Sequence, residues 1–200
     1  MKILLIGASG TLGKRLNAAL SPDHEVITAG RSSGDYHVDI RSEDSIRNMF
    51  GQCPQPEALI CAAASGDMDN FATLTQDALL DNMRGKLLGQ ISLVLVGQHF
   101  LPPGGSFTLT SGVFADEPHI GVTGGGVISG ALHSFVYAAA LELSPRMRVN
   151  AVSPGMLQDS APQYGALFPG LPAISMDAVV HAYRQTLFTD INGQVLRLYR

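Results

Sequence analysis

The sequence predicts a single α/β domain over residues 1–200, built on one Rossmann-type, doubly wound parallel sheet flanked by helices. Apolar runs of strand length alternate with helical patterns, and short connections join them. The first run, residues 2–6, shows no polar alternation, as expected of a strand that is buried on both faces. Neither an internal repeat nor a linker divides the chain, so one sheet takes up all the strands.

The elements are expected in a regular order. Apolar and β-branched runs predict strands at residues 2–6, 25–29, 36–38, 57–62, 106–110, 147–152 and 194–198. Helical spacing of apolar side chains predicts helices at residues 11–20, 43–50, 74–100, 127–144 and 176–188. Ser42 and Ser175 stand where an N-cap is needed, and a break is expected before Met83.

Composition indicates a soluble, cytoplasmic protein without a nucleic-acid or membrane partner. The net charge is −4, and the 13 Lys and Arg residues do not cluster. Cys53 and Cys61 are too few for a disulfide framework, which points to a reducing compartment. The apolar run after Lys2 is too short for a signal peptide or a membrane span. The spacing of His, Cys, Asp and Glu does not suggest a metal site.

The stretch "IGASGTLG" joins the first strand to the first helix and predicts a dinucleotide site. Gly7 allows a tight turn, Gly10 lets the backbone approach a pyrophosphate, and Gly13 lets helix and strand pack closely. The helix N-terminus offers free N–H groups to the phosphates. The spacing is G-x-x-G-x-x-G rather than G-x-G-x-x-G, and a purely structural turn is the alternative.

The second strand ends in "TAGRSSGD", which favours NADP over NAD. Gly30 stands where an acidic residue would bind the ribose 2′-hydroxyl, and Arg31 follows it with Ser32 and Ser33 as further donors. A guanidinium can hold a 2′-phosphate through two hydrogen bonds. A solvated surface arginine is the alternative.

Residues 156–174 form a long segment rich in Pro and Gly between a strand and a helix. Loops of this length are uncommon in compact domains unless they serve a site. Because the segment follows the carboxyl end of a strand, we expect it to be a lid over the substrate, with a passive connector as the alternative.

Four stretches together resemble the short-chain dehydrogenase/reductase family over nearly the whole chain, as a compact and divergent branch. They are "GASGTLG", "VDI" at 38–40, "GSFTLTSG" at 105–112 and "ALELSPRMRVNAVSPG" at 140–155. The resemblance implies that Asp39 and Ile40 hold the adenine, and that Pro154 and Gly155 bend beside the nicotinamide. Residues 62–64 stand where the family has Asn-Asn-Ala-Gly, so the usual asparagines are missing.

Glycine motif and resemblance together define the expected cofactor site. It comprises Gly7, Ser9, Gly10, Thr11, Leu12, Gly13, Arg31, Ser32, Asp39, Ile40, Ala62, Ala63, Pro154 and Gly155. Asp159 matches a position where a threonine often contacts the cofactor, and Ser160 is a possible substitute.

The family's catalytic tyrosine and lysine are missing. They lie four residues apart on one helix face, so that the lysine lowers the pKa of the tyrosine that donates the proton. Counting from the matched stretches puts Gly125 and Ser129 at these positions. Tyr137 lies too far downstream to replace the tyrosine. The usual mechanism is therefore not encoded.

Ser111 matches the family's catalytic serine, with a strand-end turn residue as the alternative. Lys86 falls where the family has an asparagine, close to the missing lysine, and is the best substitute; the alternative is a surface lysine along apolar neighbours. Asp116 and His119 could act from the substrate side, although His119 is more simply a solvated loop residue. His133 and His181 fit helix-surface positions.

Two functions remain open. One is an NADP(H)-dependent oxidoreductase acting on a small carbonyl or alcohol substrate with an altered acid–base set. The other is an NADP(H)-binding sensor or scaffold without turnover, because one fold hosts many functions. In the resembling family the helices near 83–100 and 127–144 form dimers, so we expect a homodimer or higher homo-oligomer.

Overall fold

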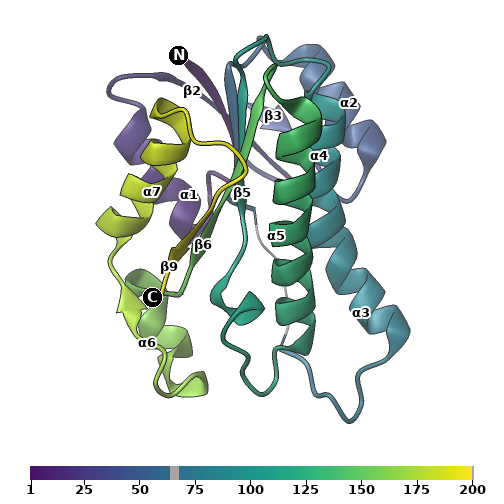
Figure 1. Cartoon of the computed structure of the whole chain (residues 1–200), viewed down its shortest axis with the longest axis vertical. Coiled ribbons are helices and arrows are strands. Elements are labelled where there is room, and N and C mark those ends of the chain that lie inside the picture. Colours follow the sequence, from purple (N-terminus) through teal and green to yellow (C-terminus); the bar gives the residue numbers. More distant parts are fainter. Residues whose placement is uncertain (64–67, 200) are drawn as a thin grey trace.

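Seven parallel strands form the central sheet of the computed structural model, which describes residues 1–63 and 68–199 (Figure 1). In spatial order they are β3 (Tyr36–His37), β2 (Glu25–Gly30), β1 (Lys2–Ile6), β4 (Ala58–Cys61), β5 (Ser106–Thr110), β6 (Arg148–Pro154) and β9 (Val195–Leu198). The strand order reverses between β1 and β4, which is the position where sheets of this kind bind ligands. The predicted fold class is confirmed.

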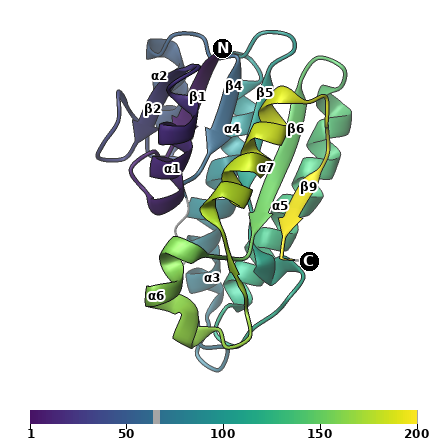
Figure 2. The same ribbon diagram turned by 90° about the vertical axis from the view of Figure 1, so that its left-hand side faces the viewer.

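Helices cover both faces of the sheet (Figures 1 and 2). One face carries α1 (Thr11–Leu20) and α7 (Met176–Phe188), and the other carries α2 (Glu43–Gln52), α4 (Gly89–Gly97) and α5 (Thr123–Leu143). Within β1, Ile3 and Leu5 belong to the core beneath α1 and α7, whereas Leu4 and Ile6 belong to the core on the other face. This explains why the strand is apolar throughout, since each face meets a helix layer.

Both predicted N-caps are present. Ser42 Oγ accepts the N–H of Ser45, and Ser175 Oγ accepts that of Ala178, each at 3.2 Å. The helix that begins at Gln76 is capped in the same way by Thr75.

The predicted break before Met83 is wrong. Helix α3 (Gln76–Met83) continues through a π-helical segment, η1 (Arg84–Leu88), directly into α4. The buried Gln90 stabilises this wider turn, because its Nε2 donates to the backbone oxygens of Lys86 and Thr110, both at 2.9 Å. Single π-helical turns are frequent at functional sites.

Helix α5 begins at Thr123, not at residue 127 as predicted, so the three glycines form its first turn. The carboxylate of Asp69 accepts the backbone N–H groups of Thr123 and Gly124 at 3.1 and 2.6 Å. Among the described residues, α5 is the one helix long and apolar enough to cross a membrane by length and composition. It packs against β6, and buried helices of soluble proteins pass the same test.

The segment 156–174 is not a bare loop. Its strands β7 (Met156–Leu157) and β8 (Ala173–Ile174) form a two-stranded parallel sheet. Between them lie the short helix α6 (Ala161–Tyr164) and two 3₁₀ turns, η3 (Gln158–Ser160) and η4 (Gly165–Leu167). Figure 2 shows α6 beyond the carboxyl ends of the central strands. Asp159 pairs with Arg15 of α1 at 2.9 Å, which ties the segment to the first helix.

Candidate active site

Two cavities lie at the carboxyl edge of the sheet and meet at Gly10 and Ala62. The first, which we call the glycine-loop cavity, has a volume of about 300 Å3 and extends from Gly7 to Arg31. The second, the Ser111 cavity, has a volume of about 420 Å3 and extends to the segment 156–174. Of the expected cofactor residues, all but Gly13 line one or both cavities.

The glycines have the geometry that the motif predicts. Gly7 has φ +85°, and a Cβ there would lie 2.6 Å from Ala63 N. A Cβ on Gly13 would lie 2.1 Å from the carbonyl oxygen of Gly7, so only glycine lets α1 pack this closely on the turn. Gly10 is the N-cap of α1 and lines both cavities.

The N-terminus of α1 is open to a ligand. Within the described parts of the chain, no side chain caps it, and its first turn carries no acidic residue. The helices α2, α3 and α7 each have a hydroxyl cap and an acidic residue in the first turn. Helix α1 therefore keeps free N–H groups and partial positive charge, which suit the pyrophosphate of a dinucleotide.

The outer end of the glycine-loop cavity is rich in donors. Arg31, Ser32 and Ser33 line it, together with Asp39 and Ile40 at the predicted adenine position. Arg41, which was not among the residues expected there, lines it too and forms an ion pair with Asp81. Its position directly after "VDI" was the available signal. Ala64 lies outside the described residues.

The Ser111 cavity is mostly apolar. Its polar lining includes Thr11, Lys86, Thr110, Ser111, Ser160 and Tyr164; its apolar lining includes Leu12, Val113, Phe114, Pro154, Met156, Leu157, Phe168 and Leu171. Six of these residues belong to the predicted lid, so that segment forms a wall of the cavity. Such a space suits a compact apolar molecule with one polar group.

Lys86 lies inside the site, and the surface-lysine alternative is wrong. Its Nζ donates to the backbone oxygen of Ser111 at 3.4 Å, and the residue lines the Ser111 cavity. A Cβ built on Gly112 would lie 3.5 Å from Ser129 Oγ and 3.7 Å from Lys86 Nζ, so Lys86 reaches the neighbourhood of the missing lysine. Burial lowers the pKa of Lys86, and the adjacent Cys61 opposes this shift.

Gly125 leaves space that another side chain partly fills. A Cβ there would contact the Phe114 ring at 3.4 Å. Phe114 packs in turn against Phe168 and His119, with ring centroids 5.1 and 5.9 Å away. His119 is therefore half-buried in an aromatic cluster rather than a solvated loop residue, which corrects the simpler expectation.

His133 is the main correction. It is buried and not on the helix surface, and its Nε2 lies 2.8 Å from Ser111 Oγ. Burial lowers its pKa, the positive charge of Arg197 lowers it further, and Asp116 raises it. Residues 125, 129 and 133 repeat at four-residue spacing along one helix face, so one more turn beyond Ser129 would have identified it. His181 is exposed as predicted.

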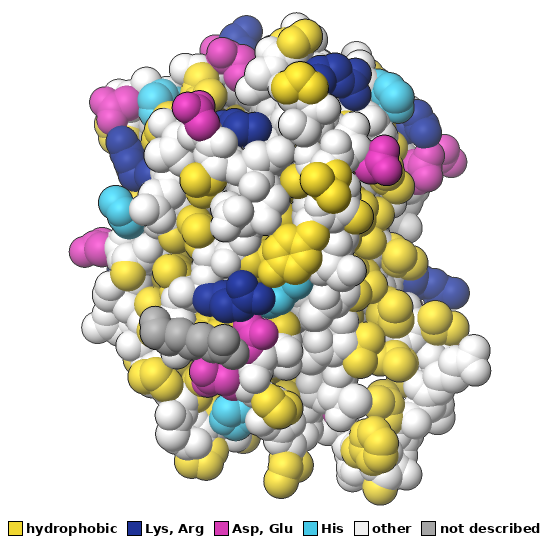
Figure 3. Space-filling model, in the orientation of Figure 1, with side chains coloured by type: hydrophobic (Ala, Val, Ile, Leu, Met, Phe, Trp, Pro, Cys, Tyr) yellow, Lys and Arg dark blue, Asp and Glu magenta, His cyan; other side chains and the backbone are white. Residues whose placement is uncertain are grey.

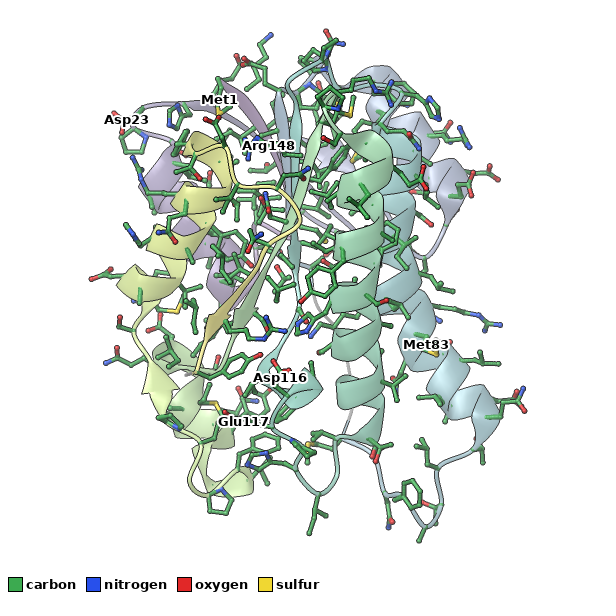
Figure 4. All side chains as sticks on the ribbon, in the orientation of Figure 1. Met1, Asp23, Met83, Asp116, Glu117 and Arg148 are labelled. Atoms are coloured by element: carbon green, nitrogen blue, oxygen red, sulfur yellow. The ribbon has the colours of Figure 1, made fainter. Side chains whose placement is uncertain are left out.

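Asp116 follows η2 (Val113–Ala115) and lies beside the lower half of α5 (Figure 4). It accepts from Arg197 Nε at 2.7 Å and from Tyr199 Oη at 2.5 Å. Arg197 also contacts Tyr137 Oη at 3.4 Å. Figure 3 shows basic, acidic and histidine side chains meeting on this face. Asp116 is thus a partner of Arg197 on β9 and of Tyr199 just after it, and not a free acid in the cavity.

The class of protein follows from three features, which are the order of the parallel strands, the glycine turn, and the open helix N-terminus where the strand order reverses. Together they define a dinucleotide-binding Rossmann protein. A family model described as Enoyl-(Acyl carrier protein) reductase matches residues 13–181. The chain belongs to the short-chain dehydrogenase/reductase family, whose members are oxidoreductases that bind a nicotinamide cofactor.

Solved structures give the same result. The protein lin1944 from Listeria innocua is 38% identical, with a TM-score of 0.96 and 100% of both chains covered. A small-chain dehydrogenase in complex with NADPH is 23% identical, with a TM-score of 0.87 over 99% of this chain and 96% of the other. Serine dehydrogenase from Escherichia coli is 17% identical, with a TM-score of 0.80 over 99% and 97%. None of the curated proteins matches the sequence significantly.

Proposed function

We propose that this protein is a cytoplasmic NADP(H)-dependent oxidoreductase that interconverts a small, mainly apolar carbonyl compound and its alcohol with an altered acid–base set. The observation that carries the proposal is that Gly10 and Ala62 line both cavities, with Arg31 in the lining of one and Ser111 and Lys86 in the lining of the other. An extended ligand bound across both cavities would reach from the guanidinium to the candidate catalytic groups.

The residues present fit a nicotinamide dinucleotide. The open N-terminus of α1 suits its pyrophosphate, and Arg31 with Ser32 suits a 2′-phosphate. Asp39 and Ile40 would hold the adenine, and Pro154 and Gly155 would adjoin the nicotinamide. The NADPH complex of a small-chain dehydrogenase with the same fold supports this choice of cofactor.

The Ser111 cavity favours a compact substrate that carries one polar group. A bound nicotinamide would supply or accept the hydride, and the protein supplies position and electrostatics. The Ser111 hydroxyl would bond the substrate oxygen, and the Lys86 ammonium would stabilise negative charge there and contact the ribose. The segment 156–174 would close over the substrate.

Binding and turnover test the proposal separately. In a thermal-shift assay NADPH should stabilise the protein by about 2.7 kcal/mol at a hundredfold excess over its Kd, and NADH at the same concentration should stabilise it by less. Loss of NADPH absorbance with benzaldehyde or cyclohexanone then reports turnover, and Ser111→Ala and Lys86→Ala should each lower it. NADPH binding without turnover of any carbonyl would instead establish a binding protein that acts as a sensor or scaffold.

A further inference from the structure

The family transfers the proton with a tyrosine and a lysine, and neither of these roles accounts for the contact between Ser111 and His133. Ser111 Oγ lies 2.8 Å from His133 Nε2 and 3.2 Å from the backbone oxygen of Ser129. Both side chains are buried, with 2% and 5% of their surface exposed. The hydroxyl carries one proton, so donation to the Ser129 oxygen leaves Oγ as the acceptor of an Nε2–H bond.

We propose that His133 is a positioning residue that relays a proton to the substrate oxygen through the hydroxyl of Ser111. The inference rests on the proposed function, since it supplies the proton that the missing tyrosine would give. Ser111 lines the cavity while His133 lies behind it on α5, so only the hydroxyl touches the substrate.

The relay balances in both directions. During reduction the carbonyl carbon accepts the hydride, and the C=O π electron pair moves onto oxygen. That oxygen takes the proton of the Ser111 hydroxyl, and Oγ takes the Nε2 proton of the imidazolium of His133. Neutral imidazole, neutral serine and the alcohol remain. Oxidation of the alcohol reverses each transfer, with neutral His133 as the acceptor.

The hydroxyl is placed for this exchange. Its bond to the Ser129 oxygen is the longer of the two contacts, so a substrate oxygen can replace that acceptor while the contact with His133 persists. Gly125 offers no competing side-chain donor at the family's tyrosine position. Lys86 Nζ donates to the backbone oxygen of Ser111 at 3.4 Å rather than to its hydroxyl.

Charged side chains near His133 tune the protonation of its imidazole. Arg197 lowers its pKa and Asp116 raises it. The titratable and charged groups on the elements around it are Asp116 after η2, Tyr137 on α5, Lys86 on η1, and Arg197 and Tyr199 at β9. Because burial and Arg197 lower the pKa, the imidazolium is the minor form at neutral pH. Carbonyl reduction should therefore slow as pH rises through the pKa of His133, and alcohol oxidation should accelerate.

The test measures NADPH-dependent reduction of benzaldehyde and cyclohexanone from about pH 5 to pH 8 in the full-length protein. The variants are His133→Gln, Ser111→Ala, the double variant, and His181→Gln as a matched control on the exposed face of α7. The amide that replaces the imidazole in His133→Gln can still donate to Ser111 but cannot titrate. We expect His133→Gln to lower the rate by about 100-fold and to flatten the pH profile, with little further loss in the double variant. The control should keep the wild-type rate and profile.

A second measurement does not depend on a variant that folds. The ring signals of His133 in the wild type, followed by NMR across the same pH range, should titrate at the pKa that the rate profile gives. Turnover with an unchanged profile in His133→Gln, or two pKa values that disagree beyond error, would overturn the relay and leave the proposed function standing. Absence of wild-type turnover with bound NADPH would overturn the proposed function itself.

Discussion

Replacing Arg31 with alanine removes the positive side chain at the outer end of the glycine-loop cavity. Arg31 is exposed, so water screens its attraction for a phosphate. Two unit charges at about 4 Å interact by about 1 kcal/mol in water and by about 4 kcal/mol at an effective dielectric of about 20. Charge-assisted hydrogen bonds contribute about 1.5–3 kcal/mol. A loss of about 2 kcal/mol follows, which is about 30-fold in Kd.

Titration calorimetry of NADPH and NADH at one ionic strength measures this loss. We expect Arg31→Ala to weaken NADPH by about 30-fold and NADH by less than about twofold, because only NADPH carries the 2′-phosphate. Arg41 does not compensate, since Asp81 already pairs with its guanidinium. Arg47→Ala is the control, because Arg47 pairs with Glu43 on α2 outside the cavity. Equal losses for both cofactors, or no loss for NADPH, would refute the assignment of Arg31 to the phosphate.

Three further changes test packing, the buried lysine and assembly. Gly13→Ala places a Cβ 2.1 Å from a backbone oxygen and should lower the free energy of unfolding in urea by about 1–3 kcal/mol. Gly51→Ala, where a Cβ meets nothing within 4 Å, should instead raise it by up to about 1 kcal/mol; equal effects would contradict the packing argument. The pKa of Lys86 is lower in the fold than in the unfolded chain, so its charged form costs stability as pH falls below the unfolded value. Lys86→Met should therefore raise the thermal midpoint above that of the wild type, and by more at neutral pH than at about pH 10. It should also slow turnover. A midpoint below that of the wild type at neutral pH would show that the ammonium stabilises the fold. Leu141 is 81% exposed on α5, where we expect a second subunit, so Leu141→Asp should convert a dimer to a monomer in light scattering. Leu167→Asp, on the segment 156–174, should not, and a monomeric wild type at micromolar concentration would end the dimer proposal.

Local sequence was sufficient for most of the fold. The strands are short apolar runs between polar turns, and Ser42 and Ser175 are caps whose partners lie within three residues. The start of α5 was not predictable in this way, because glycines disfavour helix and the stabilising carboxylate of Asp69 is 54 residues distant in the chain. The π-helical turn is equally non-local, since it depends on Gln90 reaching β5.

The same distinction between local sequence and distant contacts applies to the residues of the candidate site. The glycine loop and Arg31 were predicted from local motifs of the chain, whereas the strand-end residues were assigned through the resemblance to the family. Lys86 was predicted by position, and its burial emerged only from the packed structure. His133 was misassigned because its partner, Ser111, lies on another element and because apolar neighbours on α5 define several buried faces at once.

The open N-terminus of α1 makes the stability of the protein depend on whether an anion is bound there. A side-chain cap in place of Gly10 would typically stabilise a helix by roughly a few tenths of a kcal/mol, and α1 lacks this contribution when no anion is bound. An anion that binds there would supply an acceptor for the free N–H groups in the first turn of α1. A ligand that binds only the folded chain stabilises it by mass action, so a dinucleotide held at this terminus would raise the stability of the fold as its concentration rises.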